Sequence, residues 1–362
     1  MGRARSGGRP TLEAVAARAG VGRGTVSRVV NGAAHVSPKA RAAVLQAIDD
    51  LDYVPNRAAR SLVTHRTDCI ALVVSESEDR VFTEPFFAGV VRGVSAEIAD
   101  TVLQLWLTMD NTVNVVNGSN DRSRLGRHLT AQHVDGVLLL SLHGDDDLPR
   151  LLEDRGLPTV LGGRPTGFTP GSFVDVDNHA GARLAVDHLV ARGRRRIATI
   201  AGPQDMLAGV ARLAGYRESL TEAGLAPADD QGDQGDQGDQ GDRQSLVAYG
   251  GFSEASGQAA MHDLLERRPD LDAVFAASDP MAFGALRALK DRGRRIPDDV
   301  AVVGFDGSPA AGNTEPPLTT VHQPAEAMGR HMARLLVARI AGEPVDEPGV
   351  ILVPELVVRD SS

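Results

Sequence analysis

Two different spacings of apolar residues divide the chain. Between residues 11 and 50, apolar side chains recur every three to four positions, which is the period of amphipathic helices. The members of the first two stripes are Leu12, Val15, Ala16, Ala19, Val26, Val29 and Val30. Gly20 separates these stripes, so the pattern predicts two short helices that meet at a glycine turn, as in a helix-turn-helix.

Capping residues set the expected helix limits in this region. Thr11 is a suitable N-cap for the first helix, and the second should run from about Gly22 to Asn31. A third helix should follow the N-cap Ser37 and continue to about Asp50. Three helices of this length predict a small, complete core.

From residue 69 onward, short apolar runs of strand length alternate with helical patterns. The predicted strands lie at 69–74, 102–107, 136–141, 173–177, 196–202, 246–250, 273–278, 300–306, 318–322 and 350–358. Strands that alternate with helices favour parallel sheets covered by helices. The order permits two doubly wound α/β lobes.

Length and composition fit this division. A chain of 362 residues with 42% apolar residues is long enough for two or three globular units. Its apolar runs are far shorter than the roughly 20 residues of a membrane span. The basic N-terminus lacks an apolar signal region, which predicts a cytoplasmic protein. The single cysteine, Cys69, excludes an internal disulfide and a thiolate metal cluster.

Charge is distributed unevenly along the chain. The whole chain has a net charge of −10, yet residues 1–62 carry ten basic and four acidic residues, a local net charge of +6. A basic head on an acidic body is typical of a module that binds phosphates. This distribution favours double-stranded DNA as a partner of the head.

The valines of the second helix should face inward and leave its polar side chains outside. Arg23 and Arg28 can each pair with guanine in the major groove, whereas Ser27 and Asn31 suit phosphates. The predicted DNA contacts of the head are Thr11, Arg23, Gly24, Thr25, Ser27, Arg28 and Asn31. Gly24 has no side chain for base reading, so the two arginines should dominate and favour half-sites that contain guanine.

Three segments of the head resemble the LacI/GalR family of transcriptional regulators. They are TVSRVVNG at 25–32, VSPKAR at 36–41 and DYVPNRAARSL at 52–62. The resemblance implies that residues 55–62 form a hinge that becomes helical on the operator and inserts Leu62 into the minor groove. The hinge residues expected at DNA are Asn56, Arg57, Ala59, Arg60 and Leu62.

The resemblance extends along nearly the whole chain and implies a fold for the body. An all-α helix-turn-helix head and hinge should precede an α/β, two-lobed, periplasmic-binding-protein-like effector domain. The chain should pass between the lobes near Asp177, near 305–309 and near 340–344. The expected parts are a disordered basic arm at 1–10, the head at 11–54, the hinge and linker at 55–68, an N-terminal lobe at 69–177 plus 309–341, and a C-terminal lobe at 178–308 plus 342–359.

The cleft between such lobes is the expected ligand site. The resemblance carries Phe87, Arg212, Phe252 and Asp279 over as effector contacts, and their chemistry suits a sugar or a nucleoside-like metabolite. Asp279 is equally suited to capping a helix, Arg212 to pairing with an acidic neighbour, and either Phe86 or Phe87 should belong to the core. Weaker candidates at lobe junctions are the neighbouring pair Asp177 and Asn178, and Asp306.

Residues 229–243 contain a Gln-Gly-Asp repeat without apolar side chains. Such a segment cannot bury a core, which predicts a disordered loop inserted into the family pattern. The spacing of its aspartates does not match a calcium loop, and no metal or cofactor is expected.

These features predict a ligand-responsive, sequence-specific transcriptional regulator, with repression its expected action. It should bind a palindromic operator as a homodimer, because one helix-turn-helix reads too few bases. No catalytic motif is present, so the chain is not expected to be an enzyme. The alternative is a sugar-binding protein or a sugar-acting enzyme that uses the same two-lobed body. The sequence leaves open whether the effector releases or strengthens DNA binding.

Overall fold

The computed structural model describes residues 10–30, 35–54, 66–109, 125–144, 146–165, 167–225, 246–345, 347 and 349–362. Within these ranges the chain forms two compact units, one ending at Thr67 and the other beginning at Asp68. Several predicted features lie outside the described residues, namely Asn31, the hinge positions Asn56, Arg57, Ala59, Arg60 and Leu62, and the repeat at 229–243.

The first unit contains the three expected helices. They are α1 (Leu12–Ala19), α2 (Arg23–Val30) and α3 (Pro38–Leu51). The Thr11 hydroxyl accepts a hydrogen bond from the Ala14 amide at 3.3 Å and caps α1, while Ser37 caps α3 in the same way. Gly20 ends α1 with φ of 66°, a left-handed conformation that glycine adopts without strain. The predicted helix-turn-helix is therefore confirmed.

The core of this unit is small and fully enclosed. Its buried apolar residues are Val15, Ala16, Val26, Val29, Val44, Ala47 and Tyr53. Val26 and Val29 are buried as predicted, whereas Val30 lies at the edge of the cluster and is half-buried. Burial of this face fixes which side of α2 is presented to solvent.

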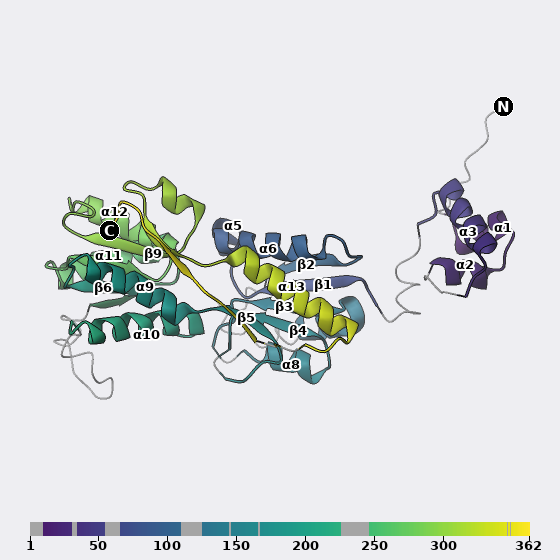
Figure 1. Cartoon of the computed structure of the whole chain (residues 1–362), viewed down its shortest axis with the longest axis horizontal. Helices are drawn as coiled ribbons and strands as arrows, with labels where there is room; N and C mark the ends of the chain where they lie inside the picture. The colour runs from purple at the N-terminus through teal and green to yellow at the C-terminus, as the bar shows by residue number, and fades with distance from the viewer. Residues whose placement is uncertain are drawn as a thin grey trace, which may run out of the picture. The chain divides into compact units, whose positions relative to one another are not determined.

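The second unit begins with an all-parallel sheet, which we call the N-lobe together with its helices. Its strands are β1 (Cys69–Val74), β2 (Gln104–Met109), β3 (Gly136–Leu140), β4 (Thr159–Gly162), β5 (Phe173–Val176) and β11 (Gly349–Leu352), in the order β11-β5-β4-β3-β1-β2. Its helical segments are α5 (Glu78–Thr83), α6 (Pro85–Ile98), the π-helix η2 (Leu129–His133), α8 (Leu148–Asp154) and α13 (Ala325–Ala341). Helices α6 and α13 pack side by side on one face of the sheet, and α8 covers the other (Figure 1).

A second six-stranded sheet forms the C-lobe. Its strands are β6 (Ile197–Ala201), β7 (Val247–Tyr249), β8 (Ala273–Ala276), β9 (Ala301–Asp306), β10 (Thr319–His322) and β12 (Glu355–Val357), in the order β12-β10-β9-β8-β6-β7. Its helices are α9 (Asn178–Ala191), α10 (Leu207–Glu222), α11 (Glu254–Arg267), α12 (Asp279–Asp291) and the 3-10 turn η4 (Pro309–Asn313). Helices α9 and α10 pack on one face, and α11 and α12 on the other. Each lobe is thus a three-layer α/β sandwich.

The chain passes between the lobes three times, but two passages differ from the expected ones. The first lies at Asp177, between β5 and α9. The second lies after β10, because Thr319 pairs with Val303 of β9 and keeps residues up to 322 in the C-lobe. The expected passage at 305–309 was therefore wrong. The glycine and proline residues at 305–309 belong to a loop within the C-lobe. Glycine and proline in the sequence indicate a loop, but they do not show whether that loop stays in one sheet or passes to another.

The third passage divides a segment that the sequence predicts as one strand. Residues 349–352 pair with β5 in the N-lobe, whereas 355–357 pair with β10 in the C-lobe. The expected passage at 340–344 was wrong, because the chain first adds an edge strand to the N-lobe. Pro354 lacks an amide donor and interrupts the run at the point where it changes sheets (Figure 1). Strand β4 was missed, since four residues show no clear period.

No helix within the described ranges is long and apolar enough to cross a lipid bilayer.

Candidate functional site

Helix α2 presents a short polar face to solvent. Arg23, Gly24 and Arg28 are exposed, and Thr25 and Ser27 are half-buried beside them. The Arg23 guanidinium lies 3.1 Å from Glu13 on α1, and both side chains are well exposed. This face carries the residues predicted to read DNA.

Arg28 and the N-cap residue Thr11 also have contacts within the head. The Arg28 Nε donates to the Gly24 carbonyl at 3.2 Å, which orients Arg28 along its own helix. Thr11 uses its hydroxyl to cap α1. Both contacts are local, so each side chain must exchange or share them to reach a phosphate or a base.

The two lobes enclose a cavity of about 810 Å³, part of which is open to solvent. Strand ends, helix starts and the passages between the lobes all contribute to its wall. Its polar and charged lining residues are Arg80, Glu84, Ser141, Arg164, Asp175, Asn178, Arg212, Ser278, Asp306 and Gln323, and its larger apolar ones are Phe86, Phe87, Leu140, Leu142, Val176, Met206, Leu207, Phe252 and Met328. Of the seven residues predicted for the effector site, five line this cavity, namely Phe87, Asn178, Arg212, Phe252 and Asp306.

Arg212 lies on α10 at the centre of the cavity wall. Its Nε donates to the Asn178 side-chain carbonyl at 2.8 Å, and its Nη1 donates to the Ala277 carbonyl at 2.6 Å. The guanidinium lies 3.7 Å from the centre of the Phe305 ring and 3.8 Å from Asp306. Burial lowers the pKa of Arg212 to about 10, so the side chain remains charged at neutral pH. These contacts hold a cation in place against the cavity.

Phe252 is a buried aromatic residue with an unusual backbone. Its φ is 60°, which is rare for a residue with a side chain and costs about 1–3 kcal/mol. Its ring lies 5.6 Å from the Arg212 guanidinium carbon and 5.8 Å from that of Arg80 on the opposite lobe. The strained turn directs an apolar face toward two cations and the cavity.

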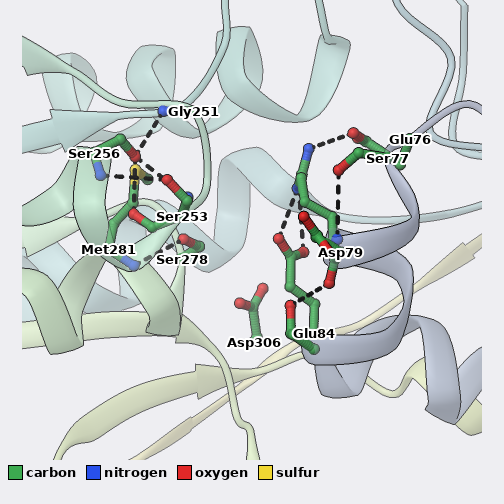
Figure 2. A network of polar contacts seen from close by, with 12 residues as sticks. Glu76, Ser77, Asp79, Glu84, Gly251, Ser253, Ser256, Ser278, Met281 and Asp306 are labelled. Atoms are coloured by element: carbon green, nitrogen blue, oxygen red, sulfur yellow. Dashed lines mark hydrogen bonds and ion pairs between the residues drawn. The ribbon is translucent and has the colours of Figure 1, made fainter. Parts of the chain in front are cut away.

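Asp306 ends β9 and faces the cavity between the lobes. One carboxylate oxygen accepts from the Asp279 amide at 3.1 Å and the other from the Gln323 side chain at 2.8 Å. Burial raises its pKa well above the ordinary range, and repulsion from Asp279 acts in the same direction, while Arg212 opposes both. Figure 2 shows Asp306 between the polar residues of the C-lobe and those of the N-lobe.

Asp279 does not line the cavity, contrary to the prediction. Its fully buried carboxylate accepts hydrogen bonds from the Thr320 hydroxyl at 2.5 Å and the Ser308 amide at 2.7 Å. It joins α12 to β10 and to the loop after β9. The preceding residue, Ser278, lines the cavity and caps α12.

Of the predicted pair Asp177 and Asn178, Asp177 does not line the cavity. Its side chain caps α9 by accepting from the Ala180 amide at 2.9 Å. Asn178 faces the cavity instead, and its amide group links Asp175 to Arg212. A helix start places neighbouring side chains in different directions, which sequence spacing alone does not resolve.

Phe86 and Phe87 both line the cavity, although the sequence suggested that only one of them would. Phe87 is 2% exposed and also belongs to the N-lobe core, while Phe86 is half-buried. Their rings meet edge to face with centres 5.4 Å apart. The pair forms an aromatic wall opposite the Arg212 side of the cavity.

The sequence did not suggest the charged residues that the N-lobe contributes. Arg80 and Glu84 lie on and after the short helix α5 and bond to each other at 2.7 Å. Arg164 donates to the buried Asp175 at 2.8 Å. Asp175 carries a signal that could have found it, because it is an acid near the end of a buried strand, but the pattern around α5 carries no such signal.

The cavity combines fixed charges and hydrogen-bonding groups with aromatic faces. Hydroxyl groups of a polar ligand can pair with a guanidinium and a carboxylate, and C–H patches can cover aromatic rings. Within the described ranges, His, Cys, Asp and Glu side chains form no group of three that could hold a metal ion. The arrangement is that of a binding site for a small polar molecule.

Comparison with known proteins matches both units. Residues 11–56 match the model of bacterial regulatory proteins of the lacI family, and residues 186–362 match that of a periplasmic binding protein-like domain. The chain is 54% identical over 355 residues to the HTH-type transcriptional regulator CelR of Thermobifida fusca, with 98% of each chain covered.

Solved structures agree with this result. A complex of the transcriptional regulator CelR with cellobiose is 52% identical, with a TM-score of 0.73 over 98% of this chain and 100% of that one. The Lac repressor dimer bound to operator and the anti-inducer ONPF is 28% identical, with a TM-score of 0.81 over 98% and 99%. Because relatives match essentially the whole chain, head and body together, this protein belongs to the LacI family of ligand-responsive, DNA-binding transcriptional regulators.

Proposed function

We propose that this protein is a repressor that binds a palindromic operator as a homodimer and responds to a sugar, with cellobiose the first effector to test. The observation that carries this proposal is the cavity, where the Arg212 guanidinium and the Phe252 ring stand together beside Asp306. A guanidinium and a carboxyl group beside an aromatic face are the chemistry expected for a polyhydroxy ring. The 52% identity to a CelR–cellobiose complex supports cellobiose in particular.

The proposed effector contacts come from both lobes. Arg212 and Asp306 would bind hydroxyl groups, and Phe252 together with Phe86 and Phe87 would cover the less polar ring faces. A ligand bound to both lobes stabilises one relative arrangement of them and so shifts a population. Its effect on DNA would follow from that shift.

The proposed DNA contacts come from the head and the hinge. Arg23 and Arg28 would read guanine, and Ser27, Thr25 and Thr11 would hold phosphates near α2. The other proposed contacts are Gly24, Asn31, Asn56, Arg57, Ala59, Arg60 and Leu62. The head would extend over 11–54 and the hinge and linker over 55–68. The protein would act in the cytoplasm, where the DNA of a bacterium lies, and would catalyse no reaction.

The test starts from selection of random duplex DNA on the full-length protein. We expect a palindrome with guanine in each half-site, because two copies of α2 would contact equivalent positions. Fluorescence anisotropy on that palindrome then measures operator affinity with and without cellobiose. A change of about tenfold is expected, within the usual range of allosteric coupling.

Arg212→Lys provides the matched control for the effector. It keeps a positive charge but replaces the two separate donors Nε and Nη1 with a single ammonium nitrogen, so it should bind the operator and lose the response to cellobiose. Recovery of no palindrome would contradict the regulator proposal. If operator affinity is unchanged at millimolar cellobiose but changes with another sugar or a nucleoside, cellobiose is not the effector, and the proposal of a ligand-responsive, operator-binding dimer stands.

A further inference from the structure

His143 connects the two lobes at the rim of the cavity. It lies in the loop after β3 of the N-lobe, and its Nδ1 lies 2.9 Å from a carboxylate oxygen of Asp205, in the loop before α10 of the C-lobe. Its Nε2 lies 3.2 Å from a carboxylate oxygen of Glu76, which follows β1. The Gly144 amide also donates to the Asp205 main-chain carbonyl at 2.8 Å. Two consecutive N-lobe residues therefore hold one C-lobe residue.

The same network reaches a second contact between the lobes. The other Glu76 oxygen lies 2.6 Å from the Arg80 guanidinium, and Arg80 is 5.8 Å from the centre of the Phe252 ring on the C-lobe. Glu76 thus joins the contact at Asp205 to the contact at Phe252. Figure 2 shows Glu76 and Glu84 on the N-lobe side, facing the serines of the C-lobe.

The surroundings of the His143 ring favour its protonated form. Both ring nitrogens face carboxylate oxygens, which only accept hydrogen bonds, and a neutral imidazole has a single N–H to offer. The His143 side chain is 13% exposed and Glu76 is 6% exposed, whereas Asp205 is 51% exposed. The charged groups around the ring are Glu76 and Asp205, with Arg80 behind Glu76.

The electrostatics agree with this geometry. Burial alone would lower the pKa of His143, but the hydrogen bonds to Glu76 and Asp205 outweigh it and raise the pKa above the ordinary value. If the lobes separate, Asp205 moves away from His143, and the part of the pKa increase that comes from Asp205 is lost. The imidazolium is therefore more stable when the lobes are in contact than when they are apart.

We propose that His143 is a positioning residue for the effector: with Glu76 and Asp205 it forms a latch that holds the lobes in contact across the cavity. His143 is absent from the cavity lining, so it acts on the ligand through the arrangement of the lobes. The inference rests on the proposed function, because it assumes that the effector binds to the same arrangement. The latch is complete below the ordinary histidine pKa and is lost as pH rises through the raised one.

The latch itself can be tested without an effector. In the full-length protein labelled at histidine, the imidazole signal absent from His143→Gln identifies His143 in an NMR titration. We expect it to titrate above the ordinary value of about 6.5 and to move toward that value in Asp205→Asn. The Gly144 amide should also exchange faster with solvent in Asp205→Asn. A His143 that titrates normally in the wild type and is unchanged in Asp205→Asn would overturn the latch.

A second measurement connects the latch to the effector. Calorimetric titration with cellobiose should show binding about three- to tenfold weaker at pH 9 than at pH 6. His143→Gln should bind with the weaker affinity at both pH values, and His331→Gln, changed on the N-lobe helix α13, should behave as the wild type. Equal affinities of the wild type and His143→Gln throughout would overturn the proposal. If cellobiose binds at no pH, the effector assignment fails, and the titration of His143 still decides whether the latch exists.

Discussion

At the scale of single residues, two acids of the C-lobe have different roles because they are buried to different extents. Asp279 is fully buried among hydrogen-bond donors of its own lobe, whereas Asp306 faces Arg212 and the cavity. Burial raises the pKa of Asp279 to about 6, although its bonds to Thr320 and Ser308 act in the opposite direction. Asp279 therefore stabilises the C-lobe elements next to the site, and Asp306 is the acid available to a ligand.

Asp279 gives a pH dependence of stability whose sign follows from this shift. Its pKa is higher in the folded state than in the unfolded state, so its contribution is complete below about pH 4 and declines as pH rises through about 6. Relative to Asp279→Asn, which does not titrate there, the wild type should lose up to roughly 3 kcal/mol of unfolding free energy between pH 4 and pH 7. Urea unfolding at several pH values measures this difference.

A control variant distinguishes the effect of burying Asp279 from the effect that removing any acid has on the pH dependence of stability. Asp263→Asn removes a half-exposed acid that pairs with Arg267 on the surface of α11. The decline between pH 4 and pH 7 should be present when the wild type is compared with Asp279→Asn and absent when it is compared with Asp263→Asn. Parallel pH profiles for the wild type and Asp279→Asn would show that Asp279 keeps its ordinary pKa.

At the scale of elements, α2 packs one face against the core of the head and carries the residues proposed to read DNA on the other. Val26 and Val29 fix its orientation in the core, and Arg23 and Arg28 project from the exposed side. The ion pair between Arg23 and Glu13 is well exposed, where solvent screens ion pairs strongly, so DNA can displace it easily. The helix is thus ordered before it meets DNA, while its reading side chain remains adaptable.

Arg23→Ala should therefore remove base preference rather than unfold the head. The selected operator and a version in which the guanine contacted by Arg23 is replaced in each half-site should differ by roughly 1–3 kcal/mol per lost contact for the wild type. In Arg23→Ala this difference should nearly vanish. Anisotropy titrations with both duplexes measure it.

Arg18 provides the control for this prediction. It lies on α1, is exposed, and donates to Asp50 on α3 at 2.9 Å, so it joins helices of the head instead of facing outward from α2. Arg18→Ala should lower the stability of the head only slightly, because solvent screens this exposed pair, and leave base preference intact. Equal loss of preference in both variants would refute the assignment of Arg23 as a reading residue.

At the scale of the whole molecule, the end of the chain links the two lobes. Strand β11 adds an edge to the N-lobe sheet, and β12 adds one to the C-lobe sheet. Beyond them Ser361 is fully buried, its amide donates to the Pro317 carbonyl at 3.0 Å, and its carbonyl accepts from the Val302 amide at 2.8 Å. The last residues are therefore part of the C-lobe fold.

Removal of residues 355–362 should destabilise the C-lobe far more than the N-lobe. It deletes β12 and leaves the buried Val302 and Thr319 amides without partners, at a cost of roughly 4 kcal/mol or more. Hydrogen exchange should accelerate in β9 and β10 and change little in β1. Asp360→Ser, which alters an exposed neighbour and keeps the segment, should exchange as the wild type. Unchanged protection of β9 after the deletion would contradict this role.

Local sequence patterns were enough to predict the features that depend only on residues close together in the chain. The caps Thr11 and Ser37, the turn at Gly20 and most strands follow from residues a few positions apart. The placement of Arg212 and Phe252 at the cavity agrees with the family resemblance. Asp279 does not reach the cavity, and of the pair Asp177 and Asn178 only Asn178 does, because residues beside a helix start differ in direction by amounts that only the backbone fixes.

The sequence by itself determined the helix-turn-helix head, the α/β class of the body and the basic net charge of residues 1–62, because each depends on periodicity, capping or local composition. Only the tertiary structure decided which sheet receives 319–322 and 349–352, since strand pairing joins residues far apart in the chain. It also decided that Arg80 reaches Phe252 and His143 reaches Asp205. Those contacts exist because two lobes, each folded around its own core, bring loops of different strands to one cavity.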